Sequence, residues 1–201
     1  MNLEAGSPKR AIAKHILSPW GIAVILMAIF FLGEAYLAWR DRAVEAALQN
    51  DPAFQSPPFE LSFSKNIPYD PLSFVGRGAQ AGLWKWSPNG LLLEDEGRRF
   101  FEESGELFVS HAPAGKRRVK RIRTNQPVGS GDRRIEFLYE WTEVAKPAAW
   151  LLSQPPRLGE EYPGEAVMTR DGAGWKVKSL RAQDFEDPMA HLKEQASGVL
   201  K

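Results

Sequence analysis

The sequence predicts an α+β fold, in which one N-terminal transmembrane helix is followed by a small antiparallel-sheet domain with packed helices. Three observations lead to this prediction: an uncharged apolar run over residues 16–33, period-two alternation that recurs between residues 106 and 180, and apolar residues at helical spacing on either side of those strands. We expect four parts in chain order: a cytoplasmic tail (1–15), a membrane helix (16–39), a stalk and proline-rich connector (40–74) and a soluble domain (75–201).

The 201-residue chain has an average and nearly neutral composition. It contains 26 Lys and Arg against 25 Asp and Glu, 43% hydrophobic residues and no Cys. Balanced charge argues against a dedicated nucleic-acid binder, and the lack of Cys excludes disulfides, thiol nucleophiles and Cys-ligated metal sites. We expect no cofactor.

The apolar run has the length of a membrane span. Residues 16–33 read ILSPWGIAVILMAIFFLG, and extension to Trp39 supplies the roughly 20 residues that a bilayer core needs. Trp20, Tyr36 and Trp39 bracket the run, as is typical of aromatic residues at the membrane interface. The apolar region is longer than that of a cleaved signal peptide, although Gly33-Glu34-Ala35 loosely fits a cleavage site. We therefore expect an uncleaved signal anchor.

Positive charge on either side of the run predicts the orientation. Lys9, Arg10 and Lys14 precede it, whereas Arg40 and Arg42 follow it. Because positive flanks stay in the cytoplasm, we expect a single-pass protein of the inner (cytoplasmic) membrane. Its N-terminus would lie in the cytoplasm and its C-terminal domain in the periplasm or outside the cell.

The rest of the chain predicts a layered domain. Prolines stiffen residues 51–74, where Phe59 to Phe63 alternates like an edge strand. We then expect a helix from Glu94 to Glu103, ended by Gly105, and strands over 106–111, 117–124, 134–142, 164–170 and 174–180. A turn at Asp171-Gly172 would pair Met168 with Trp175 and Ala166 with Val177. A terminal helix starts at Asp187-Pro188. Cystatin-like and nuclear-transport-factor-2-like cones share this layout.

A basic hairpin is the most conspicuous candidate site. Its members are Lys116, Arg117, Arg118, Lys120, Arg121, Arg123, Arg133 and Arg134. One interpretation is a surface that binds an anionic envelope component or an acidic partner. The other is a solvated edge strand whose positive charge is neutralised by ion pairs with Glu136, Glu140 and the acidic residues at 94–103.

Aromatic residues offer a second candidate site. Phe137, Tyr139 and Trp141 share one strand face, which is typical of a packed core and also of a ligand-holding cone. Trp84 and Trp86 flank Lys85 in a Gly/Pro-rich stretch and are the tryptophans expected to make surface contacts.

No linear motif predicts an enzyme. The three His residues lack ligand spacing, and no phosphate-binding loop or nucleophile motif is present. An acid–base pair such as Asp184 and Tyr139 carries no linear signature, so no catalytic or metal-binding residue is named.

These observations predict a membrane-anchored, non-enzymatic envelope scaffold or assembly subunit. Its partners would be the lipid bilayer and either another envelope protein or an anionic surface. Self-association through the helical stretch at 40–49 is left open. The alternative is a ligand-pocket domain, with or without simple acid–base catalysis.

Overall fold

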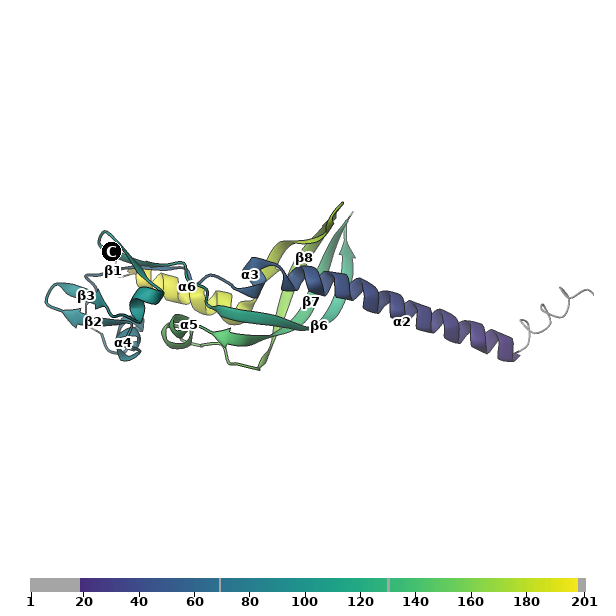
Figure 1. Ribbon diagram of the computed structural model, residues 1–201, viewed down its shortest axis with the longest axis horizontal. Coiled ribbons are helices and arrows are strands. Elements are labelled where there is room, and N and C mark those ends of the chain that lie inside the picture. The colour runs from purple at the N-terminus through teal and green to yellow at the C-terminus, as the bar shows by residue number, and fades with distance from the viewer. Residues whose placement is uncertain (1–18, 69, 130, 199–201) are drawn as a thin grey trace, which may run out of the picture. The chain divides into compact units, whose positions relative to one another are not determined.

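The computed structural model describes residues 19–68, 70–129 and 131–198. The predicted α+β class is confirmed, since antiparallel sheets and packed helices make up the molecule (Figure 1). The chain forms two compact units, residues 1–43 and 44–201, and the boundary between them falls inside helix α2 (Pro19–Gln49).

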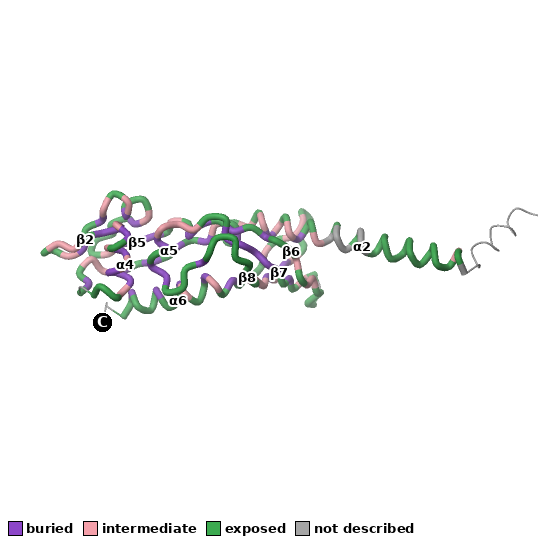
Figure 2. Tube along the Cα trace, turned by 90° about the horizontal axis from the view of Figure 1, so that it is seen from below, coloured by how far each residue is buried: buried purple, intermediate pink, exposed green. Residues whose placement is uncertain are grey.

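The first unit contains the part of α2 that ends at Ala43. Its described large apolar side chains are exposed, as for Trp20 and Leu32. Figure 2 colours this part of α2 mostly as exposed. In the described part of the chain, no helix combines the length and the apolarity needed to cross a membrane. The predicted tail over 1–15 and the first residues of the predicted span, 16–18, lie outside the described residues.

A four-stranded antiparallel meander dominates the second unit. It is formed in chain order by β6 (Gly115–Val128), β7 (Asp132–Val144), β8 (Glu161–Asp171) and β9 (Gly174–Arg181). The predicted strands at 117–124, 134–142, 164–170 and 174–180 are therefore confirmed. Ile135, Phe137, Tyr139 and Trp141 of β7 are buried at every second position, as the period-two pattern requires, and Leu138 and Glu140 between them are buried as well.

One face of this meander, which we call the inner face, carries the core. Its members are Arg117, Val119, Ile135, Phe137, Tyr139, Trp141, Ala166 and Met168. Phe54 of helix α3 (Pro52–Gln55) packs edge-on against Phe137 and Tyr139, with ring centroids 5.5 and 5.6 Å apart. Val44 and Leu48 at the end of α2 are also fully buried. The aromatic side chains thus fill this face.

A second group of short elements follows α3 in the chain. Its members are β1 (Leu61–Ser64), α4 (Phe74–Gln80), β2 (Trp84–Ser87), β3 (Gly90–Leu93), the 3-10 turn η1 (Gly97–Arg99), β4 (Glu102–Ser104) and β5 (Leu107–Ser110). Phe63 is its centre, with the rings of Phe74, Trp84 and Phe101 within 6 Å. Trp84, predicted to make surface contacts, is instead buried and donates its indole N–H to the Val75 carbonyl at 2.8 Å.

The C-terminal helix α6 (Gln183–Gly198) contacts both groups of strands through β1 and β8 (Figure 1). Met189, Leu192 and Ala196 form its buried stripe, as the spacing predicts. The helix begins earlier than the predicted Asp187-Pro188, because Ala182 closes the first turn by donating its N–H to Glu186 at 3.0 Å. The short helix α5 (Lys146–Leu151) packs on α4.

The predicted helix from Glu94 to Glu103 is wrong. Only η1 is helical there, and β4 follows it. Gly97 sits so close to the backbone of Leu83 that a Cβ would lie 1.8 Å from the Leu83 carbonyl oxygen. Gly105, at φ +59°, turns β4 back into β5, and this hairpin takes the residues that the apolar stripe assigned to a helix.

The part of the connector beyond Val44 also differs from the prediction. It belongs to the compact second unit, because Phe54, Phe59 and Phe63 supply fully buried rings. The edge strand expected near Phe59 to Phe63 is present as β1, which pairs only with β5. Aromatic burial here outweighs the stiffness that the prolines give to an extended chain.

The predicted register of the last hairpin is wrong as well. Met168 lies opposite Val177, and Ala166 lies opposite Leu180. The turn is built on the pair Asp171 and Gly174, one step later than expected, and a β-bulge between Val167 and Met168 shifts the remaining pairs.

Candidate functional site

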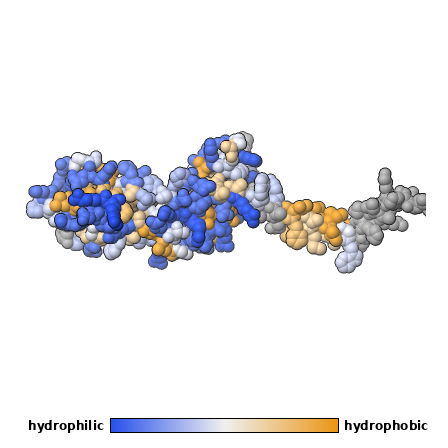
Figure 3. Space-filling view, viewed as in Figure 1, coloured by the Kyte–Doolittle hydropathy of each residue, from blue (hydrophilic) through white to orange (hydrophobic). Residues whose placement is uncertain are grey.

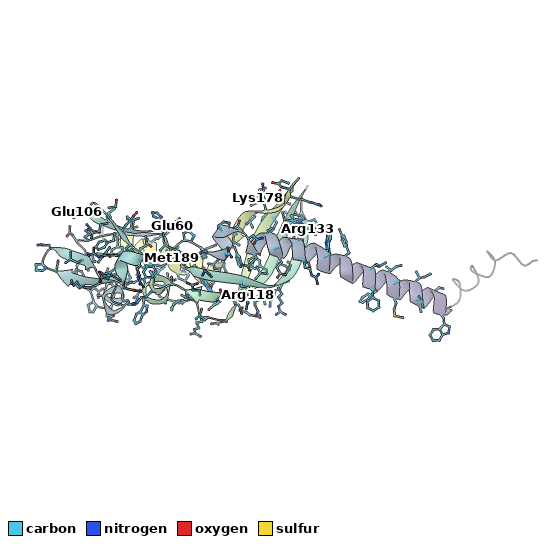
Figure 4. The ribbon with its side chains drawn as sticks, in the orientation of Figure 1. Glu60, Glu106, Arg118, Arg133, Lys178 and Met189 are labelled. Carbon is cyan, nitrogen blue, oxygen red and sulfur yellow. The ribbon has the colours of Figure 1, made fainter. Side chains whose placement is uncertain are left out.

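The solvent-facing side of the meander, which we call the outer face, carries part of the predicted basic hairpin. Its members are Arg118, Arg121, Arg134, Glu136, Leu138, Glu140, Pro163, Glu165, Val167, Ser179 and Arg181, and Arg123 lies at a β-bulge beside them. Unlike the inner face, it is dominated by charged side chains of both signs (Figure 4, where Arg118 is labelled).

Ion pairs absorb much of the positive charge. Glu140 pairs with Arg118 and, at 3.1 Å, with Lys120, and these cations hold the pKa of its carboxyl below the usual range. The remaining pairs are Lys116 with Glu143 at 2.7 Å, Arg121 with Glu161 at 3.9 Å and Arg134 with Glu165 at 2.9 Å. The acidic residues at 94–103 form other pairs, such as Glu94 with Lys85 and Glu103 with Lys65. Five of the eight basic residues of the hairpin are thus paired within the sheet.

Two arginines on this side of the sheet take no part in these ion pairs. Arg123 and Arg181 have no carboxylate within 4.0 Å among the described residues. Both line a shallow hollow of about 220 Å³ together with Glu136 and Glu165, which lie directly opposite each other in the sheet. Like charges placed opposite each other destabilise a sheet, so this row is held at a cost in stability.

Arg133 and Arg117 of the predicted hairpin point elsewhere. Arg133 donates from Nη2 to the carbonyl of Asn125 at 3.0 Å, back across its own hairpin. Arg117 lies on the inner face and is only 3% exposed. A shift in register between Lys116 and Arg117 turns this side chain inward, and a sequence pattern does not reveal such a bulge.

Arg117 occupies an aromatic cage. Its guanidinium carbon lies 4.5 Å from the ring centroid of Trp141 and 5.2 Å from those of Tyr139 and Phe185. Nε and Nη2 are buried without a hydrogen-bond partner. Burial lowers the pKa of this guanidinium to about 10, against the opposing attraction of Asp184 and Glu186. A cation held in this way costs stability unless cation–π contacts and nearby charge offset the loss of water.

Asp184, in the first turn of α6, lies close to this cage. Trp141 donates its indole N–H to Oδ2 at 2.8 Å, and the Tyr139 hydroxyl donates to Oδ1. Burial raises the pKa of this carboxyl to about 6, and the positive charge of Arg117 opposes the rise. A carboxyl whose pKa approaches neutrality beside an unpaired guanidinium is typical of functional sites.

Asp184 also lines an opening to solvent. This hollow of about 420 Å³ is bordered by Ser153, Gln154, Pro155, Pro156, Arg157, Glu160, Tyr162 and Asp184. Tyr162 accepts the backbone N–H of Arg157 at 2.9 Å and donates to Glu160 at 3.1 Å, which fixes the loop that forms one wall. We call this hollow the Asp184 pocket.

Sequence reasoning missed this pocket because its parts are far apart in the chain. Tyr139 and Trp141 stand two residues apart on one strand, so their shared face was predictable. Their common acceptor lies 45 and 43 residues further along, on a helix whose start was placed too late.

The remaining candidate residues lie on α2. Trp20, Tyr36 and Trp39, the predicted membrane-interface residues, are exposed, and the rings of Tyr36 and Trp39 lie 6.3 Å apart. In the described ranges, no cluster of three or more His, Cys, Asp or Glu side chains is arranged to hold a metal ion.

Comparison of the chain with protein-family models, curated proteins and solved structures gives no match. The interpretation of the two surfaces therefore depends on their own geometry.

Proposed function

We propose that the protein is a membrane-anchored, non-enzymatic scaffold or assembly subunit of the cell envelope, and that its outer face binds a partner protein. The observation that carries this proposal is the row of Glu136, Glu165 and Arg181 across the sheet, with Arg123 at the bulge on its far side. Within the described residues, neither Arg123 nor Arg181 has an ion pair, while Glu165 also pairs with Arg134. A row of both signs suits a protein with complementary charges better than a uniformly anionic lipid or glycan.

The filled inner face supports a non-enzymatic role. A cone that holds a ligand needs space between its sheet and its helix, and here Phe54, Phe137 and Tyr139 occupy that space. The outer face is therefore the more suitable binding surface of the meander.

Membrane anchoring by residues 16–39 is part of the proposal. The described apolar side chains at 20–33 form an exposed surface, seen as the orange stretch of α2 in Figure 3. At 1.5 Å per residue these positions cover roughly 21 Å, so an anchor for a 30 Å core also needs Ile16 to Ser18 and the aromatic end at Tyr36 and Trp39. Transfer of this surface from water to lipid supplies the driving force.

The charge pattern on either side of the anchor supports the predicted orientation. Lys9, Arg10 and Lys14 would stay in the cytoplasm, and residues 44–201 would lie in the periplasm or outside the cell. A reporter that is active only outside the cytoplasm, fused after Lys201, should be active. Activity of a cytoplasmic reporter at the same position would reverse this orientation.

Co-purification tests the outer face. The intact protein is isolated from its native membranes in mild detergent, and the chain that co-purifies in fixed stoichiometry is identified. Arg123→Gln with Arg181→Gln should weaken its binding at least about five-fold, since each arginine contributes a charged contact. The matched control, Arg99→Gln with Arg170→Gln, removes the same charge elsewhere and should leave binding unchanged. Equal effects of both pairs would contradict the proposal.

A second candidate function, a ligand-pocket domain with or without acid–base catalysis, is favoured by the Asp184 pocket. Its volume of about 420 Å³ lies within the range of small-molecule sites. Ligand binding is the part of this alternative that can be tested without a known substrate.

A further inference from the structure

We infer that the Asp184 pocket binds an alkyl-linked organic cation, the ammonium or guanidinium group of a small amine or of a peptide side chain. This inference depends on the pocket alone, so its failure leaves the outer-face proposal untouched. Three features of the pocket lead to it: the fixed orientation of Asp184, the balance of charge on the lining, and the shape of the walls.

The first feature is the way in which Asp184 is held. Tyr139 and Trp141 each donate to one carboxylate oxygen from the side of the sheet. The backbone N–H groups of Asp184 and Phe185 interact with the same carboxyl, and Asp184 itself lines the pocket. The carboxylate is thus preorganised to accept hydrogen bonds from a ligand, and two buried donors that fix it reduce the entropy lost on binding.

The second feature is charge. Two carboxylates, Asp184 and Glu160, line the pocket against one guanidinium, that of Arg157. Arg157 is mostly exposed, and its Nε lies 3.9 Å from Glu160, so it leaves Asp184 without a direct cationic partner. Arg117 is enclosed by rings and is not part of the lining. The lining therefore has a net charge of −1, which one bound cation would neutralise.

The third feature is the wall between the two carboxylates. The ring of Tyr162 and the two prolines, Pro155 and Pro156, give an apolar surface for the methylene stem of a Lys-like or Arg-like group. An aromatic ring beside a cation adds a cation–π contact. A ligand whose methylene stem lies along this wall and whose charged group contacts Asp184 would satisfy all three features of the pocket.

The pocket should lose its affinity in mild acid. Asp184 takes up a proton near pH 6, while burial raises the pKa of Tyr162 and keeps its hydroxyl neutral throughout this range. The other charged groups near Asp184 are Arg117, whose pKa of about 10 keeps it charged throughout this range, Glu186, and the lining residues Arg157 and Glu160. Affinity at pH 5 should be about one-tenth of that at pH 7.5, the fraction of Asp184 that stays ionised.

Titration of the intact protein in detergent micelles tests the inference. The probes are n-butylammonium and an arginine blocked at both ends, which separate a small amine from a peptide side chain, and sodium butyrate serves as the anion. The readout is the NMR signal of the Trp141 indole N–H, the proton that Asp184 accepts. Either cation should shift this signal saturably, and butyrate should not.

Variants make the result specific. Glu160→Gln changes an exposed side chain and keeps an oxygen that can accept the Tyr162 hydroxyl, and it should weaken cation binding about three- to five-fold. Glu102→Gln, an exposed carboxylate on β4, is the matched control and should have no effect. Asp184→Asn should abolish binding, and the Glu160 variant keeps the test valid if this one unfolds. No saturable shift with either cation, an equal shift with butyrate, or the same affinity in Glu160→Gln and Glu102→Gln would each overturn the inference.

Discussion

Trp141 donates its indole N–H to Oδ2 of Asp184 at 2.8 Å, so the centre of the meander is tied to the first turn of α6. Trp141 is 1% exposed and Asp184 is partly buried, which makes this hydrogen bond a contact between the sheet and the helix that solvent screens only weakly.

Removal of this donor should destabilise the second unit. Trp141→Phe keeps the ring but leaves Asp184 with Tyr139 as its remaining side-chain donor, and should lower the free energy of unfolding by about 2 kcal/mol. Urea denaturation followed by circular dichroism measures the change. Trp150→Phe, at a 45% exposed tryptophan, should change the stability by less than about 0.5 kcal/mol. Similar losses in the two variants would contradict the role of the hydrogen bond.

Asp184 should impose a pH dependence on stability. Its pKa of about 6 in the folded protein lies above the ordinary value of 3.8, so the folded state binds more protons between these values. Its contribution to stability is therefore present below about pH 4 and is lost as pH rises to 6, by about 2 kcal/mol. Carboxyls whose pKa is lowered in the folded protein, such as Glu140, give stability the opposite pH dependence. The difference in the free energy of unfolding between the wild type and Asp184→Asn removes their contribution and leaves that of Asp184. If this difference in the free energy of unfolding does not change between pH 4 and 7, the predicted contribution of Asp184 is excluded.

Replacement of Arg117 should raise the pKa of Asp184 and thereby change the pH dependence of stability. Arg117→Met fills the aromatic cage with an apolar side chain of similar length and removes the positive charge that opposes the rise in the pKa of Asp184. We expect a pKa for Asp184 above 6 and stability within about 1 kcal/mol of the wild type at pH 5. At pH 8 the variant should be less stable than the wild type. An unchanged pKa in a carboxyl-carbon NMR titration would show that the two groups are not coupled.

Gly97 should tolerate no side chain. A Cβ at this position would lie 1.8 Å from the carbonyl oxygen of Leu83, and a backbone atom cannot move aside as a flexible side chain would. Gly97→Ala should cost about 3 kcal/mol in thermal or urea unfolding. Gly172→Ala, where no atom lies within 4 Å of a Cβ, should be close to neutral.

Substitutions in the basic hairpin test whether its arginines serve partner binding or folding. Replacement of Arg118, Arg121 and Arg123 by Gln removes the exposed pair with Glu161 and one of the two cations at the buried Glu140, which keeps Lys120 at 3.1 Å, so Tm should fall by only a few °C. Partner recruitment per folded molecule should decrease, and recruitment by the wild type should weaken between 0.1 M and 1 M salt as charges are screened. A lower Tm with intact, salt-insensitive recruitment would assign these residues to folding alone.

The sequence allowed the meander to be predicted because Ile135, Phe137, Tyr139 and Trp141 recur at every second position, with Glu136 and Glu140 between them, and one buried face imposes that period. It did not reveal that Arg117 faces inward, since the bulge after Lys116 depends on the pairing with β7. Nor did it place Asp184 with Tyr139, because that contact depends on where α6 begins. The helix expected at Glu94 failed for a tertiary reason, the close approach of Gly97 to Leu83.

Site-specific photo-crosslinking in native membranes tests the central claim most directly. A benzophenone side chain replaces Arg121 on β6 or Ser179 on β9, both exposed on the outer face, or Glu102 on β4 as the control. The account predicts that both outer-face positions form an adduct with the same partner protein, that this adduct is lost in Arg123→Gln with Arg181→Gln, and that Glu102 forms none. Adducts with lipid only, no adduct at either outer-face position, or an equal adduct at Glu102 would contradict the claim that the outer face binds a partner protein.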